Sequence, residues 1–465
     1  MAKKTVSLEY EMKSAWEVYS SKKDAKAMDA MADRYVDFLS RCKTEREVMD
    51  YAREKVEKAG FVDDLKAPKA YRFNRNKTCF LARKGKRPLS EGFRLIGAHA
   101  DCPRLDLKQR PLYEDLDIAL AKTHYYGGVR KYQWLTMPLA IHGTVGMKDG
   151  SEVSIVIGED PADPVFTITD LLPHLAAAQM GKKVADAFEG EQLNLVMGNS
   201  PAAKPKKGKD GDEKIKEPVK RRLLELLNER YGIVEEDFFS AEMQVVPAGP
   251  ARYVGLDRSI IGSYGHDDRS SCFCGLEALL AEEEPEYCQF VLLWDKEEIG
   301  SDGATGAKSL FFEYCMEEVA EAWEPGARLS KILMNGSALS ADVNAAMDPD
   351  FKDVYEPMNA ARLGYGPCFN KFTGHRGKVG ANDAHPDYVG WLRKVFDEAG
   401  VPWHMAEIGK VDAGGGGTVA KFLAVYGMDV IDVGVPVLSM HSPFELAAKA
   451  DIYATVLAFR EFLKR

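Results

Sequence analysis

Long hydrophobic runs are missing from this sequence of 465 residues, and cysteine and histidine are sparse. No apolar stretch approaches the roughly 20 residues that cross a bilayer, and the charged N-terminal segment MAKKTVSLEYEMKSAWEVYS has no signal-peptide core. We therefore expect no membrane partner. The 8 cysteines are scattered, and the closest two, Cys272 and Cys274, lie in a helix-like run without zinc-ribbon spacing. This usage predicts reduced thiols and a cytoplasmic location.

An excess of positive charge is also missing. Lysine and arginine together number 62 against 72 acidic residues, which gives a net charge of -10. Such a balance lacks the basic surface that nucleic acids attract, so we expect no nucleic-acid partner. The lysine-rich stretch at residues 201–220, PAAKPKKGKDGDEKIKEPVK, has interleaved acids and almost nothing apolar. We predict a mobile surface loop there.

The pattern of apolar residues predicts an α/β fold. Helical spacing covers residues 7–60, short strand-like runs follow, and strands dominate residues 134–158. From residue 242 onward, buried strand-like runs alternate with helices, which is typical of a sheet covered by helices. We predict a catalytic α/β sandwich with a mixed central sheet, formed by residues 1–110 and 242–465. Residues 111–241 are expected to form a strand-rich insertion between its two parts.

Acids and imidazoles recur where predicted strands end. Each alone has a plain explanation, since a lone Asp caps a helix, a lone His packs in a core and adjacent Glu residues face solvent. Burying several charged side chains near a packed core costs folding free energy unless a cation or a partner neutralises them. In addition, the active sites of open α/β sheets lie at the carboxyl ends of strands. The residues concerned are His99, Asp101, His266, Asp267, Asp268, Glu297, Glu298, Asp342 and His441.

This set of side chains suggests a site for two divalent metal ions. Imidazole and carboxylate ligands suit zinc, cobalt or manganese, and a two-metal site needs a bridging carboxylate and a separate base for the attacking water. Glu297 and Glu298 follow the buried run YCQFVLLW and point in different directions, so one can reach a metal while the other faces the water. Asp101 lies two residues after His99, where its carboxylate can hold the imidazole's second nitrogen.

Four motifs resemble those of the aspartyl aminopeptidase family of cocatalytic dinuclear zinc aminopeptidases. The family's LIGAHTDSP, NEEVGS, SADMAHA and DIGIPQLSMHS correspond here to LIGAHADCP, KEEIGS, SADVNAA and DVGVPVLSMHS. The motifs follow the family's order over most of the chain. The resemblance implies a metallo-aminopeptidase that acts on peptides, an inserted dimerisation domain, and a homo-oligomer that builds a dodecamer from dimers.

The resemblance also implies the metal ligands. His99 and Asp342 would be terminal ligands of one ion, and Glu298 and His441 would be terminal ligands of the other. The family further uses a histidine of a neighbouring subunit, in a PHLA segment of the inserted domain. The segment LLPHLAAAQ supplies His174 for that role.

The bridging carboxylate and the base are implied in the same way. The family's LDNLHS corresponds to HDDRSS, which makes Asp267 the bridging ligand and leaves Asp268 in the position of an Asn. Glu297 would be the general base, and Asp101 would orient His99. The two hydroxyl residues of the family's HTDSP are replaced here, a change expected to alter only contacts behind the ligands.

Substrate contacts are less well matched. Lys371 aligns with a family lysine that holds an acidic substrate side chain, but its surroundings read KFTGHRGK instead of KHNANQRY. Acidic and neutral N-terminal residues therefore both stay open as the preferred substrate. The stretch DAGGGGT lacks the ending of a phosphate-binding loop. We interpret its Gly415 and Gly416 as a backbone wall beside the substrate.

The sequence is therefore interpreted as a cytoplasmic aminopeptidase that removes N-terminal residues from peptides with a water activated by two metal ions. The alternatives are a related cocatalytic hydrolase, either a deacylase or a carboxypeptidase, and a non-catalytic assembly protein. The presence of every implied metal-site residue disfavours the non-catalytic alternative.

Overall fold

The computed structural model describes residues 8–203, 215–281 and 284–465, which form two compact units. The first unit comprises Met1–Asp101, Ala251–Met440 and Glu445–Arg465, and the second comprises Cys102–Pro250 and His441–Phe444. The greater part of the loop predicted at residues 201–220 lies outside the described residues. No helix in the described part of the chain is both long and apolar enough to cross a membrane.

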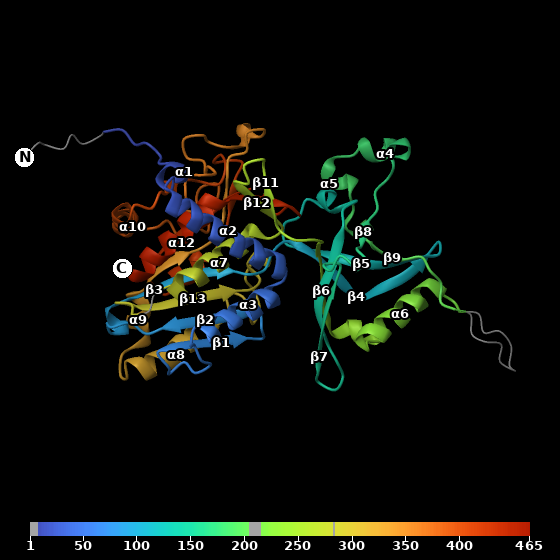
Figure 1. The fold of residues 1–465 in the computed structure, drawn as a ribbon, viewed down its shortest axis with the longest axis horizontal. Helices are drawn as coiled ribbons and strands as arrows, with labels where there is room; N and C mark the ends of the chain where they lie inside the picture. The colour runs from blue at the N-terminus through green and yellow to red at the C-terminus, as the bar shows by residue number, and fades with distance from the viewer. Residues whose placement is uncertain (1–7, 204–214, 282–283) are drawn as a thin grey trace, which may run out of the picture. The chain divides into compact units, whose positions relative to one another are not determined.

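A mixed sheet of eight strands forms the centre of the first unit, as predicted (Figure 1). Its four middle strands, β13, β3, β14 and β20, are parallel, whereas β1, β2 and β16 add antiparallel neighbours. The order across the sheet is β1 (Lys69–Asn74), β2 (Thr78–Arg83), β13 (Cys288–Trp294), β3 (Phe93–His99), β14 (Ser337–Ser340), β20 (Asp429–Gly434), β16 (Cys368–Asn370) and β18 (His404–Met405).

Helices cover both faces of this sheet. Successive side chains of its strands point to opposite faces and belong to two different apolar clusters, each with its own helices. Ile96 of β3 belongs to the cluster with α7 and α12, and the neighbouring Leu95 belongs to the cluster with α8, α9 and α11. The helices are α1 (Ala15–Val18), α2 (Lys22–Arg41), α3 (Glu45–Lys58), α7 (His266–Ala281), α8 (Phe311–Trp323), α9 (Leu329–Met334), α10 (Pro386–Ala399), α11 (Ala420–Ala424) and α12 (Lys449–Lys464).

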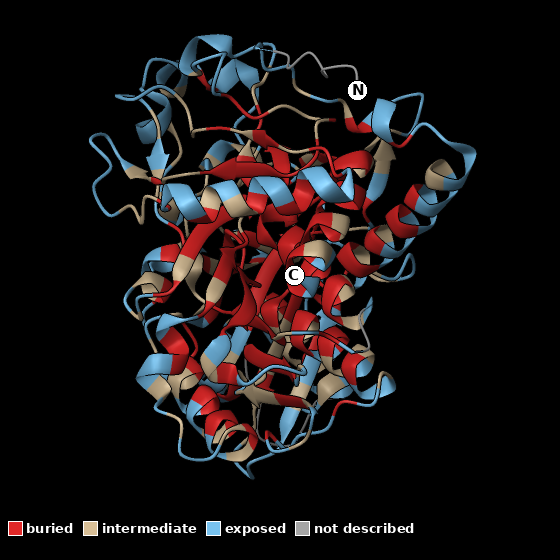
Figure 2. Cartoon of the chain, turned by 90° about the vertical axis from the view of Figure 1, so that its left-hand side faces the viewer, coloured by how far each residue is buried: buried red, intermediate tan, exposed pale blue. Residues whose placement is uncertain are grey.

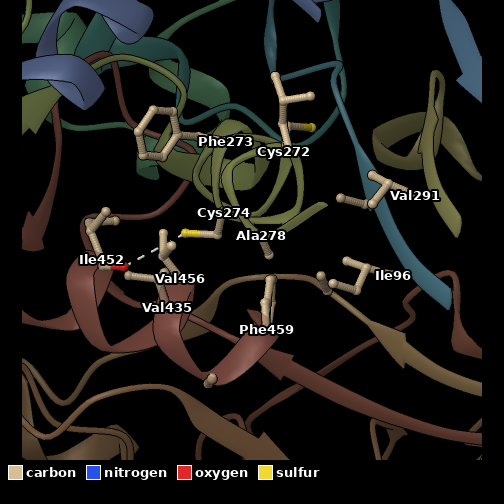
Figure 3. Close-up of a cluster of buried hydrophobic side chains, with 14 of the residues drawn as sticks. Ile96, Cys272, Phe273, Cys274, Ala278, Val291, Val435, Ile452, Val456 and Phe459 are labelled. Carbon is tan, nitrogen blue, oxygen red and sulfur yellow. Dashed lines mark hydrogen bonds between the residues drawn. The ribbon is translucent and has the colours of Figure 1, made fainter. Parts of the chain in front are cut away.

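The cluster around α7 places that helix against the strands that end at the predicted site. Figure 3 shows Cys274 and Ala278 of α7 between Phe459 of α12 and the strand residues Ile96 and Val291. The strands and the inner helix faces of this unit are buried, and the outer helix faces are exposed (Figure 2). The start of α7 is therefore fixed relative to the ends of β3 and β13.

Two smaller sheets complete the first unit. One has five strands in the order β11 (Arg252–Val254), β12 (Ile260–Ser263), β22 (Glu445–Ala448), β21 (Pro436–Leu438) and β15 (Asn344–Ala345). The other pairs β17 (Gly374–His375) with β19 (Gly415–Gly416). The five-stranded sheet leads directly into α7, since β12 precedes that helix in the chain.

The second unit is rich in strands, as expected of the insertion. Its antiparallel sheet has the order β7 (Glu152–Ile157), β6 (Leu139–Gly146), β10 (Ala241–Pro247), β4 (Arg104–Asp115), β5 (Ile118–Tyr126), β9 (Leu195–Gly198) and β8 (Thr167–Ile168). Its helices are α4 (Ala177–Met180), α5 (Val184–Ala187) and α6 (Pro218–Tyr231).

Strand β10 differs from the sequence-based expectation. Its apolar run was expected to open the second part of the catalytic domain, but β10 pairs with β6 and β4 in the sheet of the second unit. A buried strand has the same apolar pattern in either sheet, so only the pairing decides its membership. The chain passes between the two units at 101/102, 250/251, 440/441 and 444/445, whereas the predicted boundaries were at 110/111 and 241/242.

Candidate active site

Three parallel strands end side by side in the first unit and carry four of the predicted site residues. Trp294 at the end of β13 lies opposite His99 at the end of β3, and the Ala100 N–H donates to the Trp294 carbonyl at 2.8 Å. On the other side of β3, the Ala341 N–H donates to the Gly97 carbonyl at 2.7 Å. Parallel pairing therefore brings together the segments that hold His99, Glu297, Glu298 and Asp342.

The start of α7 brings two more carboxylates to this edge. Asp267 and Asp268 have non-helical backbone angles within the first turn of α7, and both side chains are buried. The Asp267 N–H donates to Glu445 Oε2 in β22 at 3.1 Å. The His99 N–H donates to Asp268 Oδ2 at 3.3 Å, which links α7 directly to the end of β3.

The two nitrogens of the His99 ring have different surroundings. Nδ1 lies 3.0 Å from the Asp101 carbonyl oxygen and 3.3 Å from Asp101 Oδ1. Nε2 lies 3.3 Å from Asp267 Oδ1 and 3.7 Å from Asp342 Oδ1. Nε2 is thus the nitrogen that faces the predicted ligands, and Asp101 lies behind the ring, where a carboxylate fixes the tautomer of a metal-binding histidine.

Asp101 has a second set of contacts that the sequence did not reveal. Its Oδ1 accepts the Glu297 N–H at 3.1 Å, and its Oδ2 accepts the Glu298 N–H at 3.2 Å. The buried Asp101 carboxylate therefore contacts His99 and also fixes the turn Glu297–Ile299. The H-x-D spacing signals only the contact with histidine, because the turn lies almost 200 residues further along the chain.

The charges of the site are unbalanced without cations. Burial, then the nearby Asp342, raises the pKa of Asp268 well above its usual range. Burial raises the pKa of Glu297 to about 8, with neighbouring carboxylates adding to the shift. Burial lowers the pKa of His99, but its contacts with three carboxylates outweigh burial and raise that pKa well above its usual range. An adjacent cation would favour each carboxylate in its charged form.

The donor atoms fit metal ions. His99, Asp268 and Asp342 each offer a ligand atom within 4.8 Å of the others, and so do His99, Asp267 and Glu298. These imidazole and carboxylate ligands are those that zinc accepts. Oδ1 of the buried Asp268 has no hydrogen-bond partner in the described part of the chain, so its charge also calls for a nearby cation.

His441 belongs to the second unit, whereas the other predicted ligands belong to the first. Its Nδ1 donates to the Gly128 carbonyl at 3.0 Å, and a ring that carries its proton on Nδ1 would bind a metal through Nε2. A Cβ atom on Gly128 would lie 3.2 Å from His441 Nδ1, so the close approach of backbone and ring favours glycine there.

His174 also belongs to the second unit, in the short turn Pro173–Leu175. The turn is strongly exposed, with exposed fractions of 51% for Leu171, 50% for Leu172 and 68% for Leu175. His174 itself is exposed.

The predicted substrate residues lie beside a cavity of about 330 Å³ in the first unit. Gly415 and Gly416 line it, and Gly415 has a φ of +135° that a side chain rarely adopts. Lys371 forms an ion pair with Asp383, which Lys378 also contacts. The sequence analysis missed the charged residues of the cavity, because no motif signals them: Arg376, Lys378, Glu407 and Lys410.

Comparison with known proteins agrees with this geometry. The family model described as "Aminopeptidase I zinc metalloprotease (M18)" matches residues 38–463. The chain belongs to the M18 family. Its M18 relatives include a probable M18 family aminopeptidase 1 from Clostridium acetobutylicum, which is 47% identical over 97% of this chain and 98% of the relative. The corresponding protein of Thermotoga maritima is 45% identical over 98% of this chain and 100% of its own length.

Solved M18 structures share the fold. The crystal structure of the M18 aminopeptidase from Thermotoga maritima matches with a TM-score of 0.91 and 45% identity, over 98% of this chain and 100% of that one. A structure described as the S. cerevisiae mApe1 dodecamer has a TM-score of 0.76 at 20% identity, over 95% of this chain and 97% of that one. The protein is thus an M18 zinc metallo-aminopeptidase, which confirms the predicted enzyme class and sets aside the non-catalytic alternative.

Proposed function

We propose that this M18 enzyme removes N-terminal residues from peptides at a centre of two divalent metal ions beside the turn Glu297–Ile299. The observation that carries the proposal is the contact of Asp101 with both the His99 ring and the N–H groups of Glu297 and Glu298. One buried carboxylate thereby positions a ligand and the adjacent pair of acids together. Such preorganisation is what a two-metal hydrolase requires.

We assign the metal ligands by combining the family match with these contacts. Asp267 is proposed as the bridge because its Oδ1 lies 3.3 Å from His99 Nε2. His99 and Asp342 would hold one ion, and Glu298 and His441 would hold the other. Zinc is the metal of the family; cobalt and manganese accept the same ligand types.

Glu297 is the proposed general base. Two bound cations would polarise the peptide carbonyl and acidify the attacking water. The Glu297 carboxylate removes the proton of that water and then delivers it to the leaving amine. Asp101 holds the backbone of both acids, and only Glu298 belongs to a group of possible ligand atoms, with His99 and Asp267.

The cavity near Gly415 is the proposed site for the side chain of the substrate's first residue. Three of its lining side chains are basic, namely Arg376, Lys378 and Lys410, and Glu407 is its acid. This balance supports a preference for an acidic N-terminal residue. The contact of Lys378 with Asp383 at 3.0 Å offsets part of this positive charge. A neutral N-terminal residue is therefore the alternative, and rates on a panel of acidic and neutral substrates would distinguish the two preferences.

We further propose a dodecamer built from dimers, in which the insertion forms the dimer contact. The exposed leucines around His174 support a contact with a second copy, because large apolar side chains seldom gather in the open. All 8 cysteines are buried, and none forms a disulfide in the described part of the chain, which supports the cytoplasm as the compartment.

The decisive experiment exchanges each acid of the pair for its amide. Glu297→Gln should lower kcat by about 10²-fold or more, because the amide cannot accept a proton, while both ions stay bound. Glu298→Gln should lose metal. Rates on aminoacyl-arylamides and metal content are measured on the same samples. Near-normal turnover of Glu297→Gln would remove it from the role of base, and the reverse pattern would exchange the two assignments.

A further inference from the structure

A cluster of buried charges lies behind the turn that carries Glu297 and Glu298. Lys77 Nζ lies 2.9 Å from Glu45 Oε1 and 3.9 Å from Asp295 Oδ2. The exposed fractions of these side chains are 11% for Lys77, 0% for Glu45 and 1% for Asp295. The cluster is separate from the proposed metal ligands, and neither the motifs nor the proposed reaction uses it.

The three residues come from three different elements. Lys77 belongs to the tight turn between β1 and β2, and Glu45 is the first residue of α3. The start of α3 is fixed by a capping box, in which Thr44 and Glu47 exchange side-chain and backbone hydrogen bonds. Asp295 directly follows β13 and precedes the catalytic turn. The Lys77 ammonium thus joins a helix start and a hairpin to the end of a central strand.

Asp295 is also the anchor of the loop that follows it. Thr305 Oγ1 donates to Asp295 Oδ2 at 2.7 Å, and the Asp295 N–H donates to the Thr305 carbonyl at 3.3 Å. Thr78 Oγ1, next to Lys77 in the chain, donates to the same carbonyl at 2.5 Å. These bonds close the loop between residues 295 and 305 and attach it to β2.

The turn Glu297–Ile299 begins two residues after Asp295. Lys296 has a φ of +70°, a left-handed conformation that a lysine adopts only when its surroundings impose it. The N–H groups of Glu297 and Glu298 are then held by Asp101 from the side of β3. Two carboxylates therefore fix the turn: Asp101 holds its N–H groups, and Asp295 anchors the chain directly before it.

Buried ion pairs give little net stability, because taking the charges out of water offsets their attraction. Such a pair can instead fix the positions of the groups it joins. Here the Lys77 ammonium lies between the buried carboxylates of Glu45 and Asp295, which would otherwise repel each other. We propose that Lys77, through its ion pair with Asp295, is a positioning residue for the turn that holds Glu297 and Glu298. The inference rests on the proposed roles of these two acids.

The test compares three variants and one control of the full-length enzyme at saturating zinc. Lys77→Met should lower kcat by roughly 10- to 100-fold, because small displacements of catalytic groups have effects of this size. KM should change by less than about threefold, since the base and not substrate binding is displaced. Lys77→Arg keeps the charge and should restore at least part of kcat. Asp295→Asn keeps the acceptor for Thr305 but removes the charge, and should resemble Lys77→Met.

Lys308→Met is the matched control. Lys308 forms an ion pair with Asp302 at 2.7 Å on the same loop, but with exposed fractions of 42% and 75%. Its removal should leave kcat unchanged. A loss of kcat in Lys308→Met equal to that in Lys77→Met would show a general sensitivity of the loop and would overturn the assignment.

A double-mutant cycle in kcat decides whether the residues act as a pair. Asp295 Oδ2 also lies 3.9 Å from Lys296 Nζ, and Lys77 also contacts Glu45. Lys77→Met combined with Asp295→Asn should therefore lower kcat by clearly less than the product of the two single losses, because the ion pair between Lys77 and Asp295 is lost in both single variants. Losses of kcat that multiply in the double variant would overturn the proposal. If Lys77→Met does not fold, the Asp295→Asn enzyme decides alone, and a kcat within twofold of the parent would overturn the proposal. An active Glu297→Gln enzyme would instead refute the proposed function, whatever the Lys77 variants show.

Discussion

At the residue scale, the site depends on which atom of each polar side chain faces inward. Asp101 directs one nitrogen of His99 toward Asp267 and Asp342, and it holds the backbone of the acids at 297 and 298. The first of these contacts follows from a spacing of two residues and was predictable. The second joins segments distant in the sequence, and no local pattern signals it.

The two adjacent aspartates should respond differently to the same substitution. Asp267→Asn should lose metal and activity, because loss of the bridging charge leaves two cations about 3.5–4 Å apart. Asp268→Asn should be milder. An amide oxygen at this position can still accept the His99 N–H. Zinc content and kcat of both variants are the measurements; equal metal loss, or the opposite order, would shift the bridge to Asp268.

At the scale of elements, the parallel pairing of β13, β3 and β14 brings most of the site residues together. β13, β3 and β14 are short apolar runs that the sequence shows clearly, and their adjacent carboxyl ends collect the polar residues that follow them. The insertion was harder to delimit. β10 has the apolar pattern of a catalytic strand but pairs with β6 and β4, because hydrogen-bonded partners are chosen by the whole sheet.

Strand β18 carries a histidine that should make stability depend on pH. His404 is buried, and its Nε2 accepts the Arg362 N–H at 3.1 Å, which requires a neutral ring. Burial lowers the pKa of His404 to about 4, below the usual value of about 6.5. The folded state therefore binds fewer protons than the unfolded state between these values. The contribution of His404 to the free energy of unfolding is therefore complete above about pH 6.5 and decreases as the pH drops toward 4.

His404→Gln keeps an acceptor for that N–H and removes the titration. From pH 6.5 to pH 5, the parent should lose stability relative to this variant by up to about 1.4 kcal/mol per pH unit. Denaturant unfolding at several pH values, at the same zinc concentration, measures the difference. His375→Gln, at an exposed position, is the control and should follow the parent. Parallel curves for the parent and His404→Gln would contradict the assignment.

At the scale of the whole molecule, two predicted site residues, His174 and His441, belong to the second unit. His441 reaches that unit with only the segment His441–Phe444, although the chain on both sides of it belongs to the first unit. His174 lies in an exposed turn beside Leu172 and Leu175. Its exposed position leaves His174 open to contact with a second copy of the chain.

We predict that His174 acts at the site of a neighbouring subunit. His174→Ala should lower kcat by about 10²- to 10³-fold, as expected for loss of a donor to the developing oxyanion, with metal content and assembly unchanged. His124→Ala, an exposed histidine of the same unit, is the control.

The trans assignment has its own test. Inactive Glu297→Gln chains and inactive His174→Ala chains are mixed, dissociated and reassembled. Activity should return, because some sites then combine an intact Glu297 with an intact His174 from another chain. No recovery in mixed assemblies, verified by native mass spectrometry, would show that each chain uses its own histidine.

The sequence by itself determined the family, the α/β class and the residue types of the site, because strand periodicity and the motifs around His99, Glu297 and His441 are local signals. Tertiary structure alone decided which sheet holds β10, how Asp101 joins the His99 ring to the catalytic turn, and that Lys77 lies between Glu45 and Asp295. The physical reason is that pairing, burial and charge contacts depend on residues far apart in the chain, and the free energy of the complete fold selects among them.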